Sequence, residues 1–458
     1  MGKAIDKLKH IKIVKTLSNI GKIEDLRTRL LVTLMFVVIY RFGSYVVLPG
    51  IDTEALQGLR NQTEGGLMSL LDMFSGGAFS KASIFALGIM PYISASIVMQ
   101  LLGIAVPFFQ KMQREGESGR RKMNQYTRYL TILILLFQGP SYLFNLRLQT
   151  GGTALYPSLD WTWFLITATI ILAAGSMFIL WLGERITDKG IGNGISLIIM
   201  IGIIARFPQA FIQELTTRFS SPGQGGLIVL LVEIVVLLAV IAAAILLVQG
   251  VRRVPVQYAK KVVGNRQYGG ARQYIPLKPY AANVMPIIFA QAIMFIPVTV
   301  AGYVSGGKLS PFMSLLIDTT SGIYNLIFAI LIVVFTYLYT AITINPTQMA
   351  EDMKRNNGFI PGVKPGKNTA DFLDRIMSRI TLPGSLFLAF IAIMPAFADL
   401  FGVQREFAQF FGGTSLLILV GVVLDTLQQI ESHLMMRHYD GLLETGRIRG
   451  AHAANGAY

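Results

Sequence analysis

The sequence of residues 161–182 is WTWFLITATIILAAGSMFILWL, and this stretch contains no charged residue. Tryptophans stand at its start, Trp161 and Trp163, and near its end, Trp181. As an α-helix rising ~1.5 Å per residue, the segment from Trp163 to Trp181 is about 27 Å long, close to the hydrocarbon thickness of a bilayer. Tryptophan concentrates at both membrane interfaces, so the stretch predicts a transmembrane helix anchored at each end.

Similar apolar runs recur along the 458-residue chain, which is 53% hydrophobic and only 14% charged. A soluble domain of this length would need a larger charged surface. The predicted spans are 30–48, 84–106, 130–146, 161–182, 191–207, 227–249, 284–303, 323–344, 380–397 and 412–430. We therefore expect an all-α polytopic membrane protein with ten transmembrane helices.

Lysine and arginine are distributed unevenly between the two sides that these spans define. With the N-terminus inside, 32 of the 40 basic residues fall in cytoplasmic segments and 7 on the outside, while Arg41 lies in the first span. This asymmetry follows the positive-inside rule, and only an even number of spans preserves it. We expect the basic segment 1–29, which lacks the apolar core of a cleavable signal peptide, and the tail 431–458 to be cytoplasmic.

Composition and motifs argue against most kinds of site chemistry. The chain has no cysteine and only four histidines, so a metal site is poorly supported. The sequence GVKPGKN at 362–368 has too few residues between its glycines for a phosphate-binding loop, and Asn368 replaces the Ser or Thr that binds magnesium. Residues 190–194, GIGNG, follow no strand, so we expect a close-packed helix entry there and not a dinucleotide site. The sequence contains no arrangement of residues typical of a catalytic site. We therefore expect neither an enzyme nor a cofactor.

Two acidic residues, Glu233 and Asp425, lie within predicted spans. A proton-coupled transporter of small solutes would use such carboxylates as a proton relay. Alternatively, each acid faces a polar interior or pairs with a neighbouring helix, which the absence of an acidic partner nearby in the sequence favours.

An unusual segment precedes the second span. Residues 67–74 are apolar, Ser75-Gly76-Gly77 interrupts them, and the apolar pattern resumes at Ile84. A short half-helix with a glycine break is tolerated at membrane depth only where it is buried in protein or lines a cavity. The alternative is an amphipathic turn lying on the membrane surface, and the sequence does not decide between the two.

Two cytoplasmic segments, 250–283 and 345–379, exceed 30 residues and are rich in Gly, Pro, Arg and Lys. Membrane orientation alone requires only a few basic residues per loop. The two segments therefore predict docking arms for a large acidic partner. Adhesion to anionic lipid headgroups is the alternative.

Several motifs of this chain resemble those of one family. They are 73–78 (MFSGGA) running into 82–97 (ASIFALGIMPYISASI), 115–122 (EGESGRRK), 125–129 (QYTRY), 181–184 (WLGE), 190–196 (GIGNGIS) and 411–418 (FGGTSLLI). In these stretches the chain is similar to SecY, the channel subunit of the bacterial Sec protein translocon. The motifs occur in order over essentially the whole chain, and the ordered set is much more specific than any one motif.

The resemblance implies two five-helix halves, 30–207 and 227–430, that form an inverted pseudo-repeat around a central pore and are hinged near the outside loop 208–226. The family's constriction positions fall on five isoleucines, Ile89, Ile93, Ile199, Ile288 and Ile418. Stiff β-branched side chains without polar atoms can form a gasket around a threading chain without binding it. When empty, such an apolar ring disfavours a continuous file of water.

The resemblance also assigns a plug to residues 67–80, on the outer side of the ring, and a lateral gate between the second and seventh spans. Candidate plug residues are Leu70, Leu71, Met73, Phe74, Ser75, Gly76, Gly77 and Phe79, and candidate gate residues are Ser94, Gln100, Asn193 and Gln291. Opening the gate would let an apolar segment enter the lipid, with each weak polar contact in the gate contributing roughly 1 kcal/mol.

A member of this family would be a passive channel in the plasma membrane of a bacterium. It would work with the membrane subunits SecE and SecG, take its energy from the SecA motor ATPase or the ribosome, and receive signal sequences and nascent chains beside the membrane lipids. The docking residues would be Arg252, Arg253, Lys260, Lys261, Arg266, Lys354, Arg355, Lys364 and Lys367. Lys364 stands where many members have Arg, and Asn265 precedes Arg266 where an arginine pair is common, which weakens the assignment of individual contacts.

Overall fold

The computed structural model describes residues 24–52, 56, 72–150, 155–156, 160–220, 226–258, 261–263, 266–268, 272–278, 285–303, 315–316 and 318–444. Of the predicted features, most of the N-terminal segment 1–29, the candidate plug residues Leu70 and Leu71, the candidate docking residue Lys260 and the end of the tail from 445 lie outside these residues.

The described chain is mostly helical, with a few short strands. The helices are α3 (Glu24–Gly43), α6 (Met90–Ala105), α7 (Pro107–Arg114), α8 (Glu117–Gln149), α9 (Trp161–Lys189), α10 (Gly194–Ser220), α11 (Gly226–Gln249), α12 (Met285–Tyr303), α14 (Gly322–Thr343), α15 (Pro346–Arg355), α16 (Lys367–Leu400), α17 (Arg405–Ala408) and α18 (Gly413–Glu444). The strands are β1 (Arg252–Tyr258), β2 (Lys261–Val263), β3 (Arg266–Tyr268), β4 (Arg272–Leu277) and β5 (Gly358–Phe359).

Each of the ten predicted spans overlaps one described helix. In the part of the chain that the structure describes, seven helices are long and apolar enough to cross a membrane, and α6 with α7 makes an eighth that bends by 102° at Val106. The other two predicted spans correspond to α3 and α12. The predicted fold class, an all-α polytopic membrane protein, is confirmed.

Helix α11 shows why these helices need a lipid solvent. Its buried residues, Leu230, Glu233, Leu237 and Ala244, are spaced by three, four and seven positions and form one narrow face. The rest of the helix exposes large aliphatic side chains, among them Ile228, Leu231, Val232, Val235 and Leu238. An apolar exterior of this extent would be unstable in water, whereas lipid tails cover it without cost.

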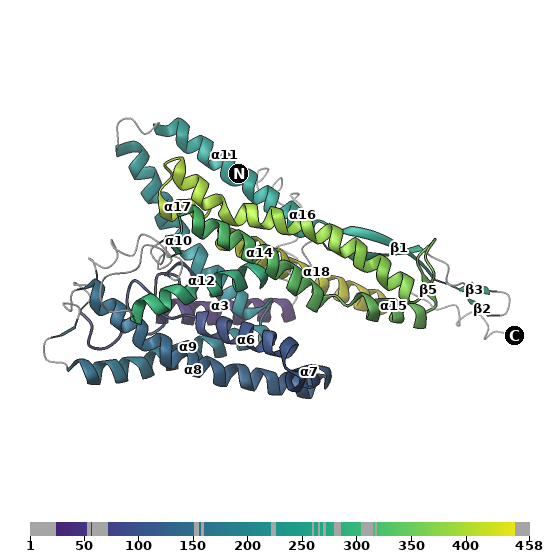
Figure 1. Ribbon diagram of the computed structural model, residues 1–458, viewed down its shortest axis with the longest axis horizontal. Helices are drawn as coiled ribbons and strands as arrows, with labels where there is room; N and C mark the ends of the chain where they lie inside the picture. Colours follow the sequence, from purple (N-terminus) through teal and green to yellow (C-terminus); the bar gives the residue numbers. More distant parts are fainter. Residues whose placement is uncertain are drawn as a thin grey trace.

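The helices form two groups (Figure 1). One contains α3, α6, α8, α9 and α10, and the other contains α11, α12, α14, α16 and α18; we call them the N-half and the C-half. The halves meet along two lines, where α10 packs against α11 and α18, and where α12 packs against α6 and α8. The strands lie at one end of the bundle, the sheet end, and α17 lies at the opposite end, the α17 end (Figure 1).

Several helix boundaries differ from the hydropathy-based prediction. Helix α6 begins at Met90 and not at Ile84, because residues 75–89 form turns in which Gly88 has a left-handed φ of +56°. The predicted hinge loop 208–226 is helical as far as Ser220, and α18 continues into the predicted tail. Polar helical turns that extend beyond the lipid are invisible to a hydropathy window, which explains these differences.

The two long basic segments are also more ordered than the predicted loops. Strand β1 pairs with β4 of the same segment and with β5 of the other one, which joins both segments in one sheet. A small apolar core lies between the sheet and the helices α15 and α16; its buried members are Val254, Val256, Leu277, Met353, Ile360, Leu373 and Met377. Asn345 caps α15 by accepting hydrogen bonds from the backbone nitrogens of Thr347 and Gln348.

Candidate functional site

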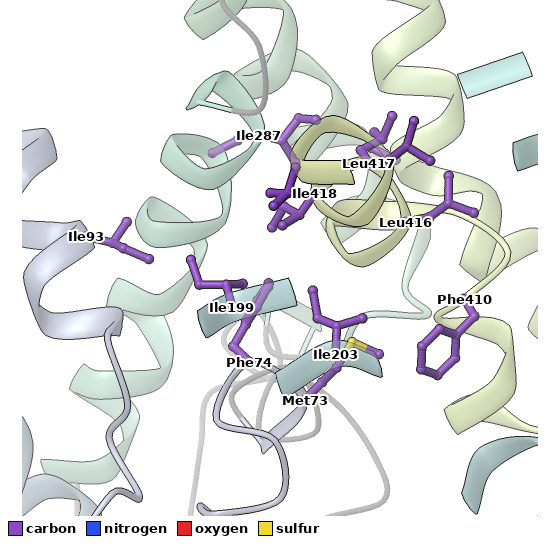
Figure 2. Close-up of a cluster of buried hydrophobic side chains, with 14 of the residues drawn as sticks. Met73, Phe74, Ile93, Ile199, Ile203, Ile287, Phe410, Leu416, Leu417 and Ile418 are labelled. Atoms are coloured by element: carbon purple, nitrogen blue, oxygen red, sulfur yellow. The ribbon is translucent and has the colours of Figure 1, made fainter. Parts of the chain in front are cut away.

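The five predicted ring isoleucines lie together where the two halves meet. Ile89, Ile93, Ile199 and Ile418 are buried members of one apolar cluster, and the half-buried Ile288 packs against it. Figure 2 shows Ile93, Ile199 and Ile418 turned toward one another from α6, α10 and α18. The site is therefore an apolar cluster to which both halves contribute.

The segment before α6 fills the space beside this cluster. Residues 72–80 are all buried, so the described part of the predicted plug is not a turn on the membrane surface. Met73 and Phe74 belong to the same apolar cluster as the isoleucines. Figure 2 shows these two side chains beside Ile199 and Ile203 of α10.

Two glycines allow the segment to approach α10 at backbone distance. A Cβ atom on Gly202 would lie 2.7 Å from the Phe74 carbonyl oxygen and 3.2 Å from the Gly76 nitrogen. Gly76 has a φ of +66°, and a Cβ there would lie 2.7 Å from Arg41 Nη1. Since no other residue fits these positions without displacement, the glycines define the seat of the segment.

Side chains of the N-half hold the backbone of this segment by its carbonyl groups. Tyr40 Oη donates to the Ser75 oxygen over 3.2 Å, Arg41 Nη1 to the Gly76 oxygen over 2.9 Å, and Tyr142 Oη to the Phe79 oxygen over 2.8 Å. These bonds satisfy carbonyls that no regular secondary structure pairs, which buried backbone requires. The segment is thus specifically bound, and its contacts are with a few side chains and not with a helix or sheet ladder.

Arg206 of α10 connects this segment to the C-half. Its guanidinium pairs with the Asp72 carboxylate and, at 3.3 Å, with the Glu406 carboxylate of α17. Asp72 also accepts a 2.7 Å hydrogen bond from the Ser80 nitrogen, which closes the turn. The hydropathy-based reading missed Arg206, because it stands at the end of a predicted span. An arginine at the edge of an apolar run was the only sequence signal of this bridge.

The predicted gate helices are in contact, since α12 packs against both α6 and α8. On α6, Ser94 and Gln100 are half-buried and bond within their own helix. Asn193 instead caps α10, accepting from the Ile195 and Ser196 nitrogens. Gln291 of α12 is buried and lines a pocket inside the C-half. The printed hydrogen bonds of Ser94, Gln100 and Asn193 are local to their own segments, and their assignment to a gate with Gln291 stays a prediction.

The two acids of the transporter interpretation lie in different surroundings, one buried and one exposed. Glu233 is buried and pairs with Arg218, which also pairs with Glu214 over 2.7 Å and donates to the Gly402 oxygen over 2.9 Å. Asp425 is exposed on α18. This arrangement supports the structural interpretation of Glu233, and the described residues hold no group of three metal-ligating side chains.

The sheet end presents the described basic side chains of both long segments. Arg252 and Arg253 on β1, and Lys354, Arg355, Lys364 and Lys367 around α15 and the start of α16, are all exposed. Lys261 and Arg266 belong to the β2–β3 hairpin. The Lys364 carbonyl accepts a 2.9 Å hydrogen bond from Thr369 Oγ1, which fixes the turn before α16. Strands and helix ends thus display exposed basic side chains from both segments at the sheet end.

Two groups of apolar helices that meet at an apolar cluster, with a short buried segment seated in it, define a polytopic membrane protein built of two helical halves. Its relatives make the family certain. The chain belongs to the SecY family: the family model for SecY matches residues 83–427. The membership predicted from the motifs is confirmed.

Two protein translocase subunits SecY illustrate the similarity. The protein of Streptomyces galbus is 42% identical over 431 residues, covering 92% of this chain and 97% of that protein. The protein of Escherichia coli K12 is 40% identical over 435 residues, covering 94% and 96%.

Solved structures share the fold at lower identity. A structure described as a protein conducting channel has a TM-score of 0.54 at 18% identity, covering 94% of this chain and 95% of that one. A second, described as showing that the plug domain of SecY stabilises the closed state and maintains a membrane seal, has a TM-score of 0.56 at 18% identity and the same coverage. A canine Sec61 chain from a ribosome–channel complex has a TM-score of 0.54 at 17% identity.

Proposed function

We propose that this chain is the protein-conducting channel of a bacterial plasma membrane, passing unfolded secretory polypeptides outward and releasing transmembrane segments into the lipid. The observation that supports it best is the packing of Met73 and Phe74 in the same cluster as Ile89, Ile93 and Ile199. The described part of this short segment, 72–80, occupies the space that a threading chain would need.

The direction of transport follows from the charges. We assign the sheet end to the cytoplasm because it carries the exposed basic segments, and the α17 end to the outside. Both termini are then cytoplasmic. Arg206 links Asp72 to Glu406 of α17, so we assign the described part of the plug, 72–80, to the outer side of the ring, and a chain arriving from the cytoplasm would meet the isoleucines first.

Passage then requires two displacements. The threading chain pushes Met73 and Phe74 out of the cluster, and the isoleucines close around it, because aliphatic side chains exclude water without forming hydrogen bonds to a passing backbone. Lateral release requires α12 to separate from α6 and α8, which exposes the interior to lipid along that line. The 30–207 and 227–430 halves would move relative to each other by bending α10 near Pro208, because Arg218 near the end of this helix is attached to Glu233 of α11.

Partners would bind the sheet end. We propose that Arg252, Arg253, Lys354 and their neighbours contact the SecA motor ATPase or the ribosome, and that SecE and SecG complete the membrane complex. Two related structures support the ribosome as a partner, since the canine Sec61 channel and the yeast Ssh1 complex are both described as ribosome-bound. Contacts with ribosomal RNA release counterions, so binding should weaken steeply with salt.

The absence of native cysteine allows a direct test of the channel. A single cysteine replaces Ile89 or Ile288, and a second one is placed in a secretory chain stalled during export. The proposal predicts a disulfide from each ring position, while a cysteine replacing the exposed Leu231 on α11 stays unlinked. If Leu231→Cys crosslinks and the ring positions do not, the chain does not pass through this constriction.

The transporter alternative has a separate test. The double substitution Glu233→Gln with Asp425→Asn removes both candidate relay carboxylates. A proton-coupled transporter would lose transport completely, whereas the channel should continue to export protein at a rate limited only by the amount of folded complex. Complex yield, measured in parallel, separates lost stability from lost transport.

A further inference from the structure

A pocket inside the C-half is not explained by the constriction or the plug. Its walls come from α12, α14, α16, α17 and the first turn of α18, and its volume is about 70 Å³. Gln291 of α12 and Tyr324 of α14 lie in its wall, and Asp399 and Arg405 belong to its lining toward the α17 end. We call this space the α12 pocket.

Two polar side chains in the wall of the α12 pocket interact with each other without a well-formed hydrogen bond. Gln291 Nε2 and Tyr324 Oη make no hydrogen bond of good geometry to any described residue. Both residues are almost fully buried, with exposed fractions of 2% and 3%. A buried donor or hydroxyl without a partner is costly, and native proteins satisfy such groups with protein or with ordered water.

The dimensions of the pocket select the occupant. A buried water needs ~10–15 Å³ of space, so 70 Å³ holds about five waters. A drug-sized ligand needs a pocket of roughly 300 Å³ or more. Threonine and serine hydroxyls at the start of α18, Thr414 and Ser415, also line the space. The lining is mostly apolar, but its unsatisfied polar groups and its volume give water both hydrogen-bond partners and room.

The pocket also has a route to solvent. Asp399 and Arg405, paired at 3.7 Å, have side chains that are 25% and 53% exposed. Because both residues line the pocket and reach the surface, water can exchange past this ion pair. The exchange would occur at the α17 end, away from the sheet.

We propose that the α12 pocket is a water site, filled from the α17 end, whose waters hydrogen-bond Gln291 and Tyr324. The site lies on the side of α12 that faces α14, only three residues along the helix from Ile288. Waters replace fixed protein partners there, so α12 can shift relative to α14 by exchanging mobile hydrogen bonds. This role in movement rests on the proposed function of α12 in the gate; the hydration itself does not.

Silver ions test the hydration, because they are about as small as water and react with thiols only where water reaches. The full chain, in membranes with its natural partners, carries one cysteine at Ala396, which lines the pocket, or at the neighbouring Phe397, which faces outward from α16. Silver is added to either side, and the remaining thiols are labelled with a maleimide after denaturation. The proposal predicts that silver protects Ala396→Cys at least tenfold faster than Phe397→Cys. Equal rates would show that the pocket is dry or closed and would overturn it.

The exposed Asp160, before α9 at the α17 end, supplies a control for sidedness. If silver reaches Asp160→Cys and Ala396→Cys only from the cytoplasm, the assigned orientation is wrong while the water site stands. If silver reaches both from outside, orientation and water site agree.

A second comparison asks whether Gln291 and Tyr324 hold the water. Replacing them by Gln291→Leu together with Tyr324→Phe removes the polar atoms with little loss of volume. The silver reaction of Ala396→Cys should then slow at least fivefold, while that of Asp160→Cys stays unchanged. An unchanged rate at Ala396→Cys, in a variant that assembles normally, would contradict the assignment of these two residues.

Discussion

Arg206 and Arg218 lie twelve residues apart on α10, and each bridges two carboxylates. Their surroundings differ: we regard the Arg206 contacts as movable and the Arg218 contacts as fixed. The Arg218 side chain is 5% exposed, and its partners are Glu214 of the same helix and Glu233 of α11. The Arg206 side chain is 16% exposed, and one of its partners is Asp72 of the plug.

The Arg218 cluster ties three pieces of the chain together. Besides the two acids, Arg218 binds the Gly402 carbonyl, and Glu214 accepts a 2.8 Å hydrogen bond from the Gln404 nitrogen. The outer end of α10 is thereby attached to α11 and to the turn before α17, although α10 belongs to the N-half. Movement of the halves must therefore bend α10 below this cluster, and Pro208, which lacks a backbone N–H, is the weakest point between the two arginines.

The first prediction concerns this fixed cluster and has the largest effect. Arg218→Met leaves two buried carboxylates without a counter-charge, and breaking a buried ion pair in this way costs about 3–5 kcal/mol. The thermal unfolding midpoint of the purified complex in detergent should fall sharply. Arg405→Met is the matched control: its pair with Asp399 is more exposed, and such pairs contribute about 1 kcal/mol at most. Equal melting of the two variants would contradict the comparison.

The second prediction concerns the bridge to the plug. Arg206→Gln removes the charged hydrogen bonds that Arg206 donates to Asp72 and Glu406, and such bonds contribute about 1.5–3 kcal/mol, so the plug should leave its seat at least roughly tenfold more often. The resting ion conductance of membranes containing the complex should rise accordingly, with a smaller change in melting than Arg218→Met produces. Arg206→Lys should give an intermediate conductance, since it keeps the charge and loses the planar fork. A sealed Arg206→Gln channel would show that the bridge does not hold the plug.

The third prediction tests the seat itself. A methyl group at Gly202 would collide with the Phe74 carbonyl, and small additions to a packed site cost about 1–3 kcal/mol. Gly202→Ala should therefore also increase the resting conductance. Gly226→Ala, whose Cβ meets no neighbour, is a control for the general effect of losing a glycine, although its φ of +54° adds local strain. If both glycine variants leak equally, the contact with the plug is not the cause.

The fourth prediction has the smallest expected effect: high salt should weaken the ion pairs of Arg206 more than those of Arg218. Raising the ionic strength from ~0.1 M to ~1 M shortens the screening length from about 10 Å to 3 Å, and it acts more strongly on exposed pairs. The resting conductance per channel should rise slightly more than bulk conductivity explains, because the Arg206 bridge weakens, while the melting midpoint set by Arg218 hardly changes. A clear fall of the melting midpoint, with no conductance rise beyond that of bulk conductivity, would reverse the comparison.

The two arginines also show what a single sequence can predict. Each span predicted from hydropathy overlaps a described helix, because the lipid requirement acts on every residue of a span. Hydropathy placed helix ends poorly, as at Ser220 and Met90, because polar turns and glycine breaks carry little hydropathy signal. The sheet at β1 was missed within a basic segment, although the alternation around Val254 and Val256 was a sequence signal for it.

The site was predictable only where it is apolar. The ring isoleucines and Met73 and Phe74 fall in one cluster at the positions that the family resemblance assigned. The polar contacts depend on residues that are distant in the chain, such as Arg206 with Glu406, and no local pattern predicts them. Glu233 shows the same limit: its partner Arg218 stood in a predicted loop, so the pairing became visible only in three dimensions.

The central claim is that a passing chain displaces the plug from the isoleucine cluster, and one disulfide tests it. Met73→Cys and Ile203→Cys place two thiols on side chains that lie beside each other in the resting state (Figure 2). Oxidation should link them efficiently in the idle complex and should fail when a stalled secretory chain occupies the channel. Equal linking with and without the stalled chain would mean that the plug stays seated during export, and the account of the site would be wrong.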